Sequence, residues 1–69
     1  HADALHNVGY INYEFKQDYD IAIECFTSAI KADSTFWQAY ANRAKAYEKK
    51  GESQKAAEDF KKAEELKGN

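Results

Sequence analysis

Three polar side chains in the middle of the chain could together bind an anion. Asn42, Lys45 and Lys49 are separated by three, four and seven residues, and such spacings place side chains on one face of an α-helix. An amide N–H and two ammonium groups in one row can donate charge-assisted hydrogen bonds to a carboxylate. The row therefore indicates a surface for an acidic peptide. The alternative is that both lysines are ordinary solvated residues of the helix.

No set of residues points to catalysis. Cys25 would need a positioned base to act as a nucleophile, and His6 belongs to another predicted helix with no residue to orient it. His1, His6 and Cys25 lack the spacing of a structural zinc site, which takes four protein ligands. The glycines form no phosphate-binding loop. We expect no enzyme, no metal and no cofactor, and we interpret Cys25 as a buried or half-buried packing residue.

The composition is that of a small folded domain. Of the 69 residues, 43% are hydrophobic and 32% are charged, which is typical of globular chains. Residues 1–34 carry two lysines and six acids, a balance of −4, whereas residues 35–69 carry eight basic residues and six acids, a balance of +2. Neither half has the strong basic stripe of a nucleic-acid-binding protein.

The compartment can be inferred from a few absences in the sequence. One cysteine cannot form an internal disulfide and is typical of a reducing compartment. No apolar run reaches the roughly 18 residues that span a bilayer, and no secretory signal is present. We expect a cytoplasmic protein that does not contact a membrane. The first residue is His rather than Met, which indicates a piece of a longer protein.

A pattern of alanine and phenylalanine recurs with a period of 34 residues. The pattern is Ala-x-x-x-Phe-x-x-Ala, and its two copies begin at Ala22 and Ala56. Tyr13 returns as Tyr47 at the same separation. A period of this length is typical of stacked helical hairpins. Alanines let two helices approach closely, and a phenylalanine one turn later fills the space between them.

The apolar spacing predicts four helices, at about residues 2–15, 19–32, 36–50 and 53–67. Asp18 or Asp20 is a suitable N-cap for the second helix, and Thr35 with Gln38 has the spacing of a capping box. Gly51 suits a left-handed helix end. The first helix is expected to pack through an apolar row of Leu5, Val8, Ile11 or Asn12, and Phe15. The sequence therefore predicts an all-α fold of two antiparallel hairpins.

In these residues the chain resembles the tetratricopeptide repeat family. The first copy matches at four positions, and the second copy, which starts at Trp37, matches at seven: Tyr40, Ala44, Tyr47, Gly51, Ala56, Phe60 and Ala63. The resemblance covers residues 2–69. It implies a short right-handed solenoid that forms a single domain over residues 1–69, with repeat one at about 2–35 and repeat two at about 36–69.

The chain departs from the family pattern at a few positions. Arg43 stands where the family usually has Leu, and Ser34 stands where it often has Pro. Counting back from Ala22 places Tyr10 at a position where the family has a small residue, whereas a shift of one residue places Gly9 there. The shift requires one extra residue between Gly9 and Ala22. A longer first helix and a wider turn are both open explanations.

In arrays that resemble this one, the first helix of each hairpin lines a concave groove that binds peptides. The resemblance places seven side chains in that groove: His6, Asn7 and Tyr10 from the first copy, and Gln38, Asn42, Lys45 and Lys49 from the second. The segment from Asn42 to Tyr47 is similar to the middle repeat of chaperone-binding domains, which clamp the C-terminal carboxylate of a chaperone. Only Asn42 can be transferred to that clamp, because its first Lys and Asn fall on His6 and Tyr10. An intact clamp is not expected in this chain alone.

Two functions follow as hypotheses. In the first, the chain is a protein–protein interaction module of a scaffold or co-chaperone, and its groove receives a peptide such as the acidic C-terminal segment of a chaperone. In the second, the chain is a structural unit that stacks on further repeats or pairs with a second copy through its exposed end faces. Arrays usually need about three repeats for stability, which favours either truncation of a longer array or self-association.

Overall fold

The computed structural model describes residues 1–68; Asn69, the last residue of the predicted second repeat, lies outside them. The described residues form helices and turns and contain no strand. The elements in chain order are α1 (Ala2–Ile11), the π-helical turn η1 (Asn12–Lys16), α2 (Tyr19–Ala32), α3 (Trp37–Lys49) and α4 (Ser53–Lys67). The all-α prediction is confirmed, and the bounds of α2 and α4 are those expected from the sequence.

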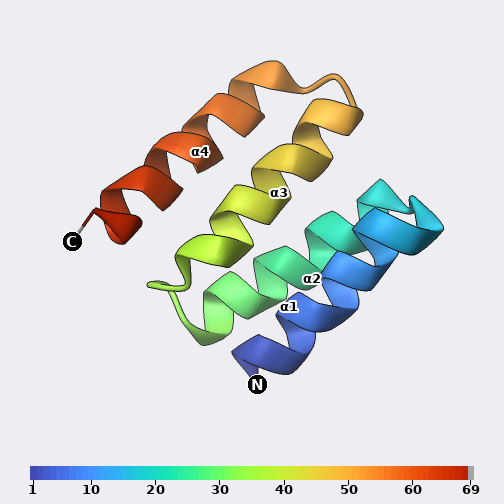
Figure 1. Ribbon diagram of the computed structural model, residues 1–69, viewed down its shortest axis with the longest axis horizontal. Coiled ribbons are helices and arrows are strands. Elements are labelled where there is room, and N and C mark those ends of the chain that lie inside the picture. Colours follow the sequence, from blue (N-terminus) through green and yellow to red (C-terminus); the bar gives the residue numbers. More distant parts are fainter. Residues whose placement is uncertain (69) are drawn as a thin grey trace.

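The helices lie side by side as two antiparallel hairpins (Figure 1). Helix α1 with η1 packs on α2, α3 packs on α4, and α2 packs on α3 to join the two hairpins. The described chain extends 32 × 28 × 15 Å, and the shortest of these dimensions is little more than the diameter of one helix, about 10–12 Å. The molecule therefore has two broad faces. The stack of helices ends at α1 on one side and at α4 on the other (Figure 1), and we call these two sides its helical ends.

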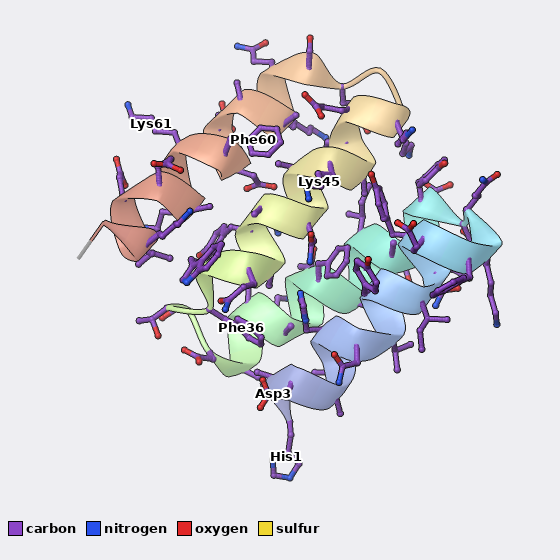
Figure 2. The ribbon with its side chains drawn as sticks, viewed as in Figure 1. His1, Asp3, Phe36, Lys45, Phe60 and Lys61 are labelled. Carbon is purple, nitrogen blue, oxygen red and sulfur yellow. The ribbon has the colours of Figure 1, made fainter. Side chains whose placement is uncertain are left out.

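The repeated alanines and phenylalanines make the contacts between helices. Ala22, Phe26 and Ala29 of α2 are fully buried, and Ala56 and Ala63 of α4 are almost so. The ring of Phe60 is half-buried on α4 (Figure 2). The predicted use of the alanine and phenylalanine pattern is therefore confirmed.

The predicted packing row of the first helix is correct only in part, because Leu5 is half-buried and Asn12, the stated alternative to Ile11, is buried. Helix α1 buries Gly9, and η1 buries Asn12, whereas the apolar side chains expected in the core are exposed: Val8 (48%), Ile11 (46%) and Phe15 (75%). Gly9 lies directly against α2. A β-carbon at this position would be 2.7 Å from the Phe26 ring and 3.1 Å from Cys25 Cβ. The close approach of two helices at a glycine thus decides the orientation of α1, and its apolar row turns outward.

The extra residue of the first repeat lies in η1. In the second hairpin, Glu52 N donates to Tyr47 O over five residues; in the first, Asp18 N donates to Asn12 O over six. A π-helical turn is the usual way to insert one residue into a helix. The matching bonds make Asn12, rather than Tyr13, the counterpart of Tyr47. They also support the shifted register, in which Gly9 corresponds to Ala44.

The first helix of each hairpin ends at a left-handed residue. Gln17 has φ +56° and Gly51 has φ +81°, and the two residues are 34 positions apart. In the second hairpin, Gly51 N donates to Glu48 O at 3.0 Å and Glu52 N to Tyr47 O at 2.9 Å. These two bonds form the Schellman motif. Gln17 takes the same conformation without the freedom that glycine has there.

The predicted cap is present at the N-terminus of α2 and absent at the N-terminus of α3. Asp18, rather than Asp20, caps α2 by accepting from Ile21 N at 3.2 Å. The capping box predicted from Thr35 is absent, because the Thr35 hydroxyl donates to Asp33 Oδ1 at 2.7 Å. Phe36 is the residue at the N-cap of α3 and makes no side-chain cap bond. The turn between the hairpins is thus closed by Asp33 and not by a cap on α3.

Candidate peptide-binding groove

His6 and Asn42 join the leading helices of the two hairpins. His6 Nε2 lies 2.8 Å from Asn42 Nδ2. An amide nitrogen only donates, so Nε2 accepts and the ring proton is on Nδ1 in the neutral tautomer. His6 therefore has a partner that orients it, which the sequence did not indicate. One N–H and the carbonyl oxygen of the Asn42 amide remain available for another group.

The imidazole of His6 sits between two aromatic rings. Its centroid is 5.6 Å from that of Phe26 and 4.9 Å from that of Phe36. Burial lowers the pKa of His6 below its ordinary value, and the Asp3 carboxylate partly opposes this effect. His6 is accordingly neutral at pH 7 and brings no positive charge to the position where a clamp lysine would stand.

The other predicted groove residues lie at the surface of α1 and α3. Asn7 and Tyr10 are exposed on α1, and Gln38, Lys45 and Lys49 are exposed on α3; Figure 2 shows Lys45 on α3. The side chains of these five residues make no hydrogen bond within residues 1–68. The structure thus brings together His6 and Asn42 and leaves the remaining groove side chains free of side-chain partners.

The two walls of the groove carry opposite charges. Asp3 lies near enough to His6 to affect its pKa. Glu14 of η1 and Lys49 of α3 meet at a hollow of about 150 Å³, which is also lined by Tyr13, Gln17 and Tyr19. The rings of Tyr13 and Tyr19 meet edge to face there, with centroids 5.8 Å apart. The first repeat thus contributes the acids Asp3 and Glu14 near the groove, whereas α3 contributes the exposed Lys45 and Lys49.

A second hollow lies at the turn end of the hairpins. Its volume is about 370 Å³, and its lining comes from the η1–α2 turn and from Lys50. The Lys50 ammonium pairs with Asp20 across this hollow, which raises the pKa of Lys50. The cation of Lys50 is thus engaged in joining α3 to α2, and the hollow offers less positive charge than its lysines suggest.

Arg43 fixes the position of α3 against two neighbouring helices. Its Nε and Nη2 donate to the two carboxylate oxygens of Asp59 on α4 at 2.7 and 2.8 Å, and its Nη1 donates to Thr27 Oγ1 on α2 at 3.1 Å. The bond to Asp59 raises the pKa of Arg43. The guanidinium also lies 5.6 Å from the Tyr40 ring centroid and 5.8 Å from that of Tyr47. This contact holds the helix that carries Asn42.

Sequence reasoning missed the partner of Arg43. The signal was present, because Arg43 replaces an apolar residue of the family and Asp59 lies between Ala56 and Ala63 on the buried side of α4. Two opposite charges at positions expected to be buried on facing helices indicate an ion pair.

Comparison with protein families agrees with the architecture. Two family models, both described as tetratricopeptide repeat, match residues 2–36 and residues 25–58. The first of these covers half of the chain, and the chain belongs to the tetratricopeptide repeat family. Repeats of this family mediate protein–protein interaction, and α1 and α3 are the leading helices of the two repeats.

The described residues contain neither a membrane-spanning helix nor a cluster of metal ligands. Within residues 1–68, no helix combines the length and the apolar character needed to cross a bilayer. The same residues contain no group of three or more His, Cys, Asp or Glu side chains that could hold a metal ion. Cys25 is half-buried, and burial raises the pKa of its thiol, with a smaller contribution from Glu24.

Proposed function

We propose that the groove between α1 and α3 binds an extended peptide with an acidic end. The observation that carries this proposal is the 2.8 Å contact between His6 and Asn42. It holds the Asn42 amide in one orientation on the same helical face as Lys45 and Lys49. A preorganised amide costs less conformational entropy on binding than a free one, and the two lysines add attraction for a carboxylate.

The charges of the two walls set a direction for the peptide. Its carboxylate lies over α3, between Asn42 and the two lysines, and a neutral or basic part lies over Asp3 of α1. His6 occupies the place of the clamp lysine and orients Asn42 without binding the carboxylate through charge. The groove therefore selects for one carboxylate group, such as a chain terminus, rather than for a uniformly acidic segment.

The cellular role that fits this site is that of a non-enzymatic scaffold or co-chaperone in the cytoplasm. The family's general role in protein interaction supports it, as does a single, half-buried cysteine of the kind found in reducing compartments. The acidic C-terminal segment of a chaperone is one peptide of the required chemistry.

A peptide titration tests the groove. A fluorescein-labelled acidic decapeptide is used in two forms, with a free C-terminal carboxylate and with an amide. We expect the free form to bind more tightly, and Asn42→Ala to weaken its binding by at least about tenfold, since a hydrogen bond to a charged group contributes roughly 1.5–3 kcal/mol. Lys45→Ala should weaken it by less, because an exposed ammonium contributes about 0–1 kcal/mol.

Lys61→Ala is the matched control for the lysine variant. Lys61 is exposed on α4, away from α1 (Figure 2), and its removal should leave the titration unchanged. Equal binding of the carboxylate and amide peptides, or unchanged binding in both groove variants, would remove the proposal.

A second candidate function is structural, with the chain associating through one of its helical ends. The observation that favours it is the group of large apolar side chains that remain exposed on the first hairpin, among them Val8, Ile11 and Phe15. The partner at this end is either a second copy of the chain, which gives a homodimer, or another helical element. Sedimentation velocity over a range of protein concentrations, with Phe15→Ser as the variant, tests this pairing.

A further inference from the structure

One side of α1 is exposed in the first hairpin. The equivalent side of α3 in the second hairpin is covered by α2. Because η1 holds one extra residue, residues of α1 align with residues of α3 that lie 35 positions later. Ala4, Val8 and Ile11 thus correspond to Ala39, Arg43 and Ala46. The two α3 alanines are fully buried, whereas Ala4, Val8 and Ile11 are exposed. A helix thus covers the row on α3, whereas the equivalent row on α1 is uncovered in the described chain.

Helix α2 is the element that covers the row on α3. It packs on α3, and Thr27 accepts a hydrogen bond from Arg43 in the middle of the row. Residues Ile23 and Ile30 of α2 are half-buried and lie four residues before and three residues after Thr27, so they share its face. The row of Ile23, Thr27 and Ile30, spaced by four and three residues, is therefore the side of α2 that packs against α3, the leading helix of the second repeat.

The equivalent surface of the first hairpin is apolar and carries no charge in its centre. Where the second repeat has Arg43 and Asp59, the first repeat has Val8 and Cys25. Ile21 at the start of α2 is also 43% exposed and lies one helical turn before Cys25. We call this surface the α1 outer face; it consists of Ala4, Val8, Ile11, Phe15, Ile21 and Cys25.

The half of the chain that forms the α1 outer face carries a net negative charge. Residues 1–34 carry two lysines and six acids, and in the described chain Asp20 is the one acid of this half that forms an ion pair. Glu24 lies beside Cys25 at the edge of the face, one turn after Ile21. A partner whose flanks carry lysine or arginine would be attracted to this surface, and an acidic partner would be repelled.

A second copy of the chain fits this surface poorly. Two α1 outer faces would bring together two halves that each carry a balance of −4. The other end of the molecule, on α4, exposes Ala57, Lys61 and Glu64, and all the large exposed hydrophobic residues of the described chain lie within its first 21 residues. Neither end of a second copy therefore offers an apolar row with basic flanks.

We propose that the α1 outer face binds an amphipathic helix that has an apolar row at spacings of four and three residues and basic residues on both flanks. This inference rests on the second candidate function, association through a helical end, and it names the partner. The helix lies against α1 as α2 lies against α3. Its apolar row contacts Val8 and Ile11, and its flanks lie near Glu24.

Two synthetic peptides of 16 residues test the partner. Both are acetylated and amidated, and both carry isoleucines at the spacing of Ile23, Thr27 and Ile30; lysines flank the row in one and glutamates in the other. Fluorescence anisotropy is measured with the full chain at two salt concentrations. We expect saturable binding of the lysine peptide, weakened by salt because ionic screening reduces the attraction, and little binding of the glutamate peptide.

Two exposed positions provide the matched variants. Ile11→Glu places a charge in the α1 outer face and should weaken binding of the lysine peptide at least about tenfold, since it removes burial of a large aliphatic side chain. Gln54→Glu adds the same charge at an exposed position of α4, outside both the α1 outer face and the groove, and should leave binding unchanged. Circular dichroism checks that both variants are folded.

Each alternative result has a definite meaning. Equal binding of the two peptides, or equal effects of the two variants, overturns the proposed partner. A concentration-dependent dimer that Ile11→Glu abolishes also overturns it, but preserves association through the helical end. A chain that stays monomeric and binds neither peptide overturns the second candidate function together with this inference.

Discussion

The Arg43 guanidinium and the Asp59 carboxylate face each other with two parallel hydrogen bonds of 2.7 and 2.8 Å. Their side chains are 17% and 9% exposed, so each ion depends on the other for most of its hydrogen bonding. The first repeat uses Val8 and Cys25 at the same positions. The second repeat thus joins its two helices through an ion pair, whereas the first has an exposed valine and a half-buried cysteine at these positions.

Removal of one member of this pair should cost more than removal of both. Asp59→Ala leaves a largely buried guanidinium without its partner, and we expect a loss of about 3 kcal/mol in the free energy of unfolding. The double variant Arg43→Val with Asp59→Cys reproduces the first repeat and should lose clearly less. Urea denaturation at pH 7 measures both. A double variant as unstable as Asp59→Ala would mean that the charge left unpaired is not the cause.

Gly9→Ala should destabilise the first hairpin although alanine favours helices. The new β-carbon would lie 2.7 and 2.9 Å from two atoms of the Phe26 ring, and overpacking of this kind costs about 1–3 kcal/mol. Asn7→Ala, on the exposed side of α1, is the matched control and should be neutral or slightly stabilising. Thermal unfolding of the two variants separates these effects. Rescue of Gly9→Ala by Phe26→Leu would identify the ring as the obstacle.

Gln17→Gly should stabilise the protein. Gln17 has φ +56°, and the left-handed conformation costs an ordinary L-residue roughly 1–2 kcal/mol, part of which glycine loses again through its greater freedom in the unfolded chain. We expect a net gain of about 0.5–1 kcal/mol in urea denaturation. The opposite substitution, Gly51→Ala, should lower stability by a similar amount. An unchanged midpoint for Gln17→Gly would show that the turn does not hold this conformation in solution.

The contact between His6 and Asn42 should weaken as the pH falls. Burial lowers the pKa of His6 below 6.5, so the unfolded chain takes up this proton more readily than the folded chain does. Stability is therefore highest above pH 6.5 and falls as the pH drops from there through the lowered pKa. NMR titration of the His6 ring should give a midpoint below 6.5, and Asp3→Asn should move it lower, because the carboxylate raises this pKa.

His6→Gln is the matched variant for the pH effect. A glutamine oxygen can accept from Asn42 and does not titrate, so the decrease in unfolding free energy between pH 7.5 and pH 5 should be smaller in this variant. An equal decrease in both proteins would assign the pH dependence to other groups.

The sequence predicted the parts of the fold that repeat. Ala22, Phe26 and Gly51 have counterparts or family positions that fix their roles, and α2 has the expected bounds. The orientation of α1 was missed because an apolar row is the usual sign of a buried face, and Val8, Ile11 and Phe15 make such a row on the exposed side. A glycine gives no hydrophobic signal, although Gly9 marks the true contact.

The candidate groove could be predicted only in part. The row of Asn42, Lys45 and Lys49 follows from helical spacing alone, and the structure leaves both lysines exposed on α3. The contact between Asn42 and His6 joins residues 36 positions apart, so it depends on how the two hairpins pack. The pairing of Arg43 with both Asp59 and Thr27 depends on the same packing, and no local pattern contains it.

The π-helical turn has a practical consequence for anyone who transfers mutational data between the two repeats. For residues up to Asn12, the equivalent residue of the second repeat lies 35 positions later. After the turn it lies 34 positions later, as Gly51 does relative to Gln17. One residue rotates a helix by about 100°. A substitution map copied onto α1 with a uniform offset would thus exchange solvent-facing sites for contact sites, and a harmless position in one repeat would mark a damaging one in the other.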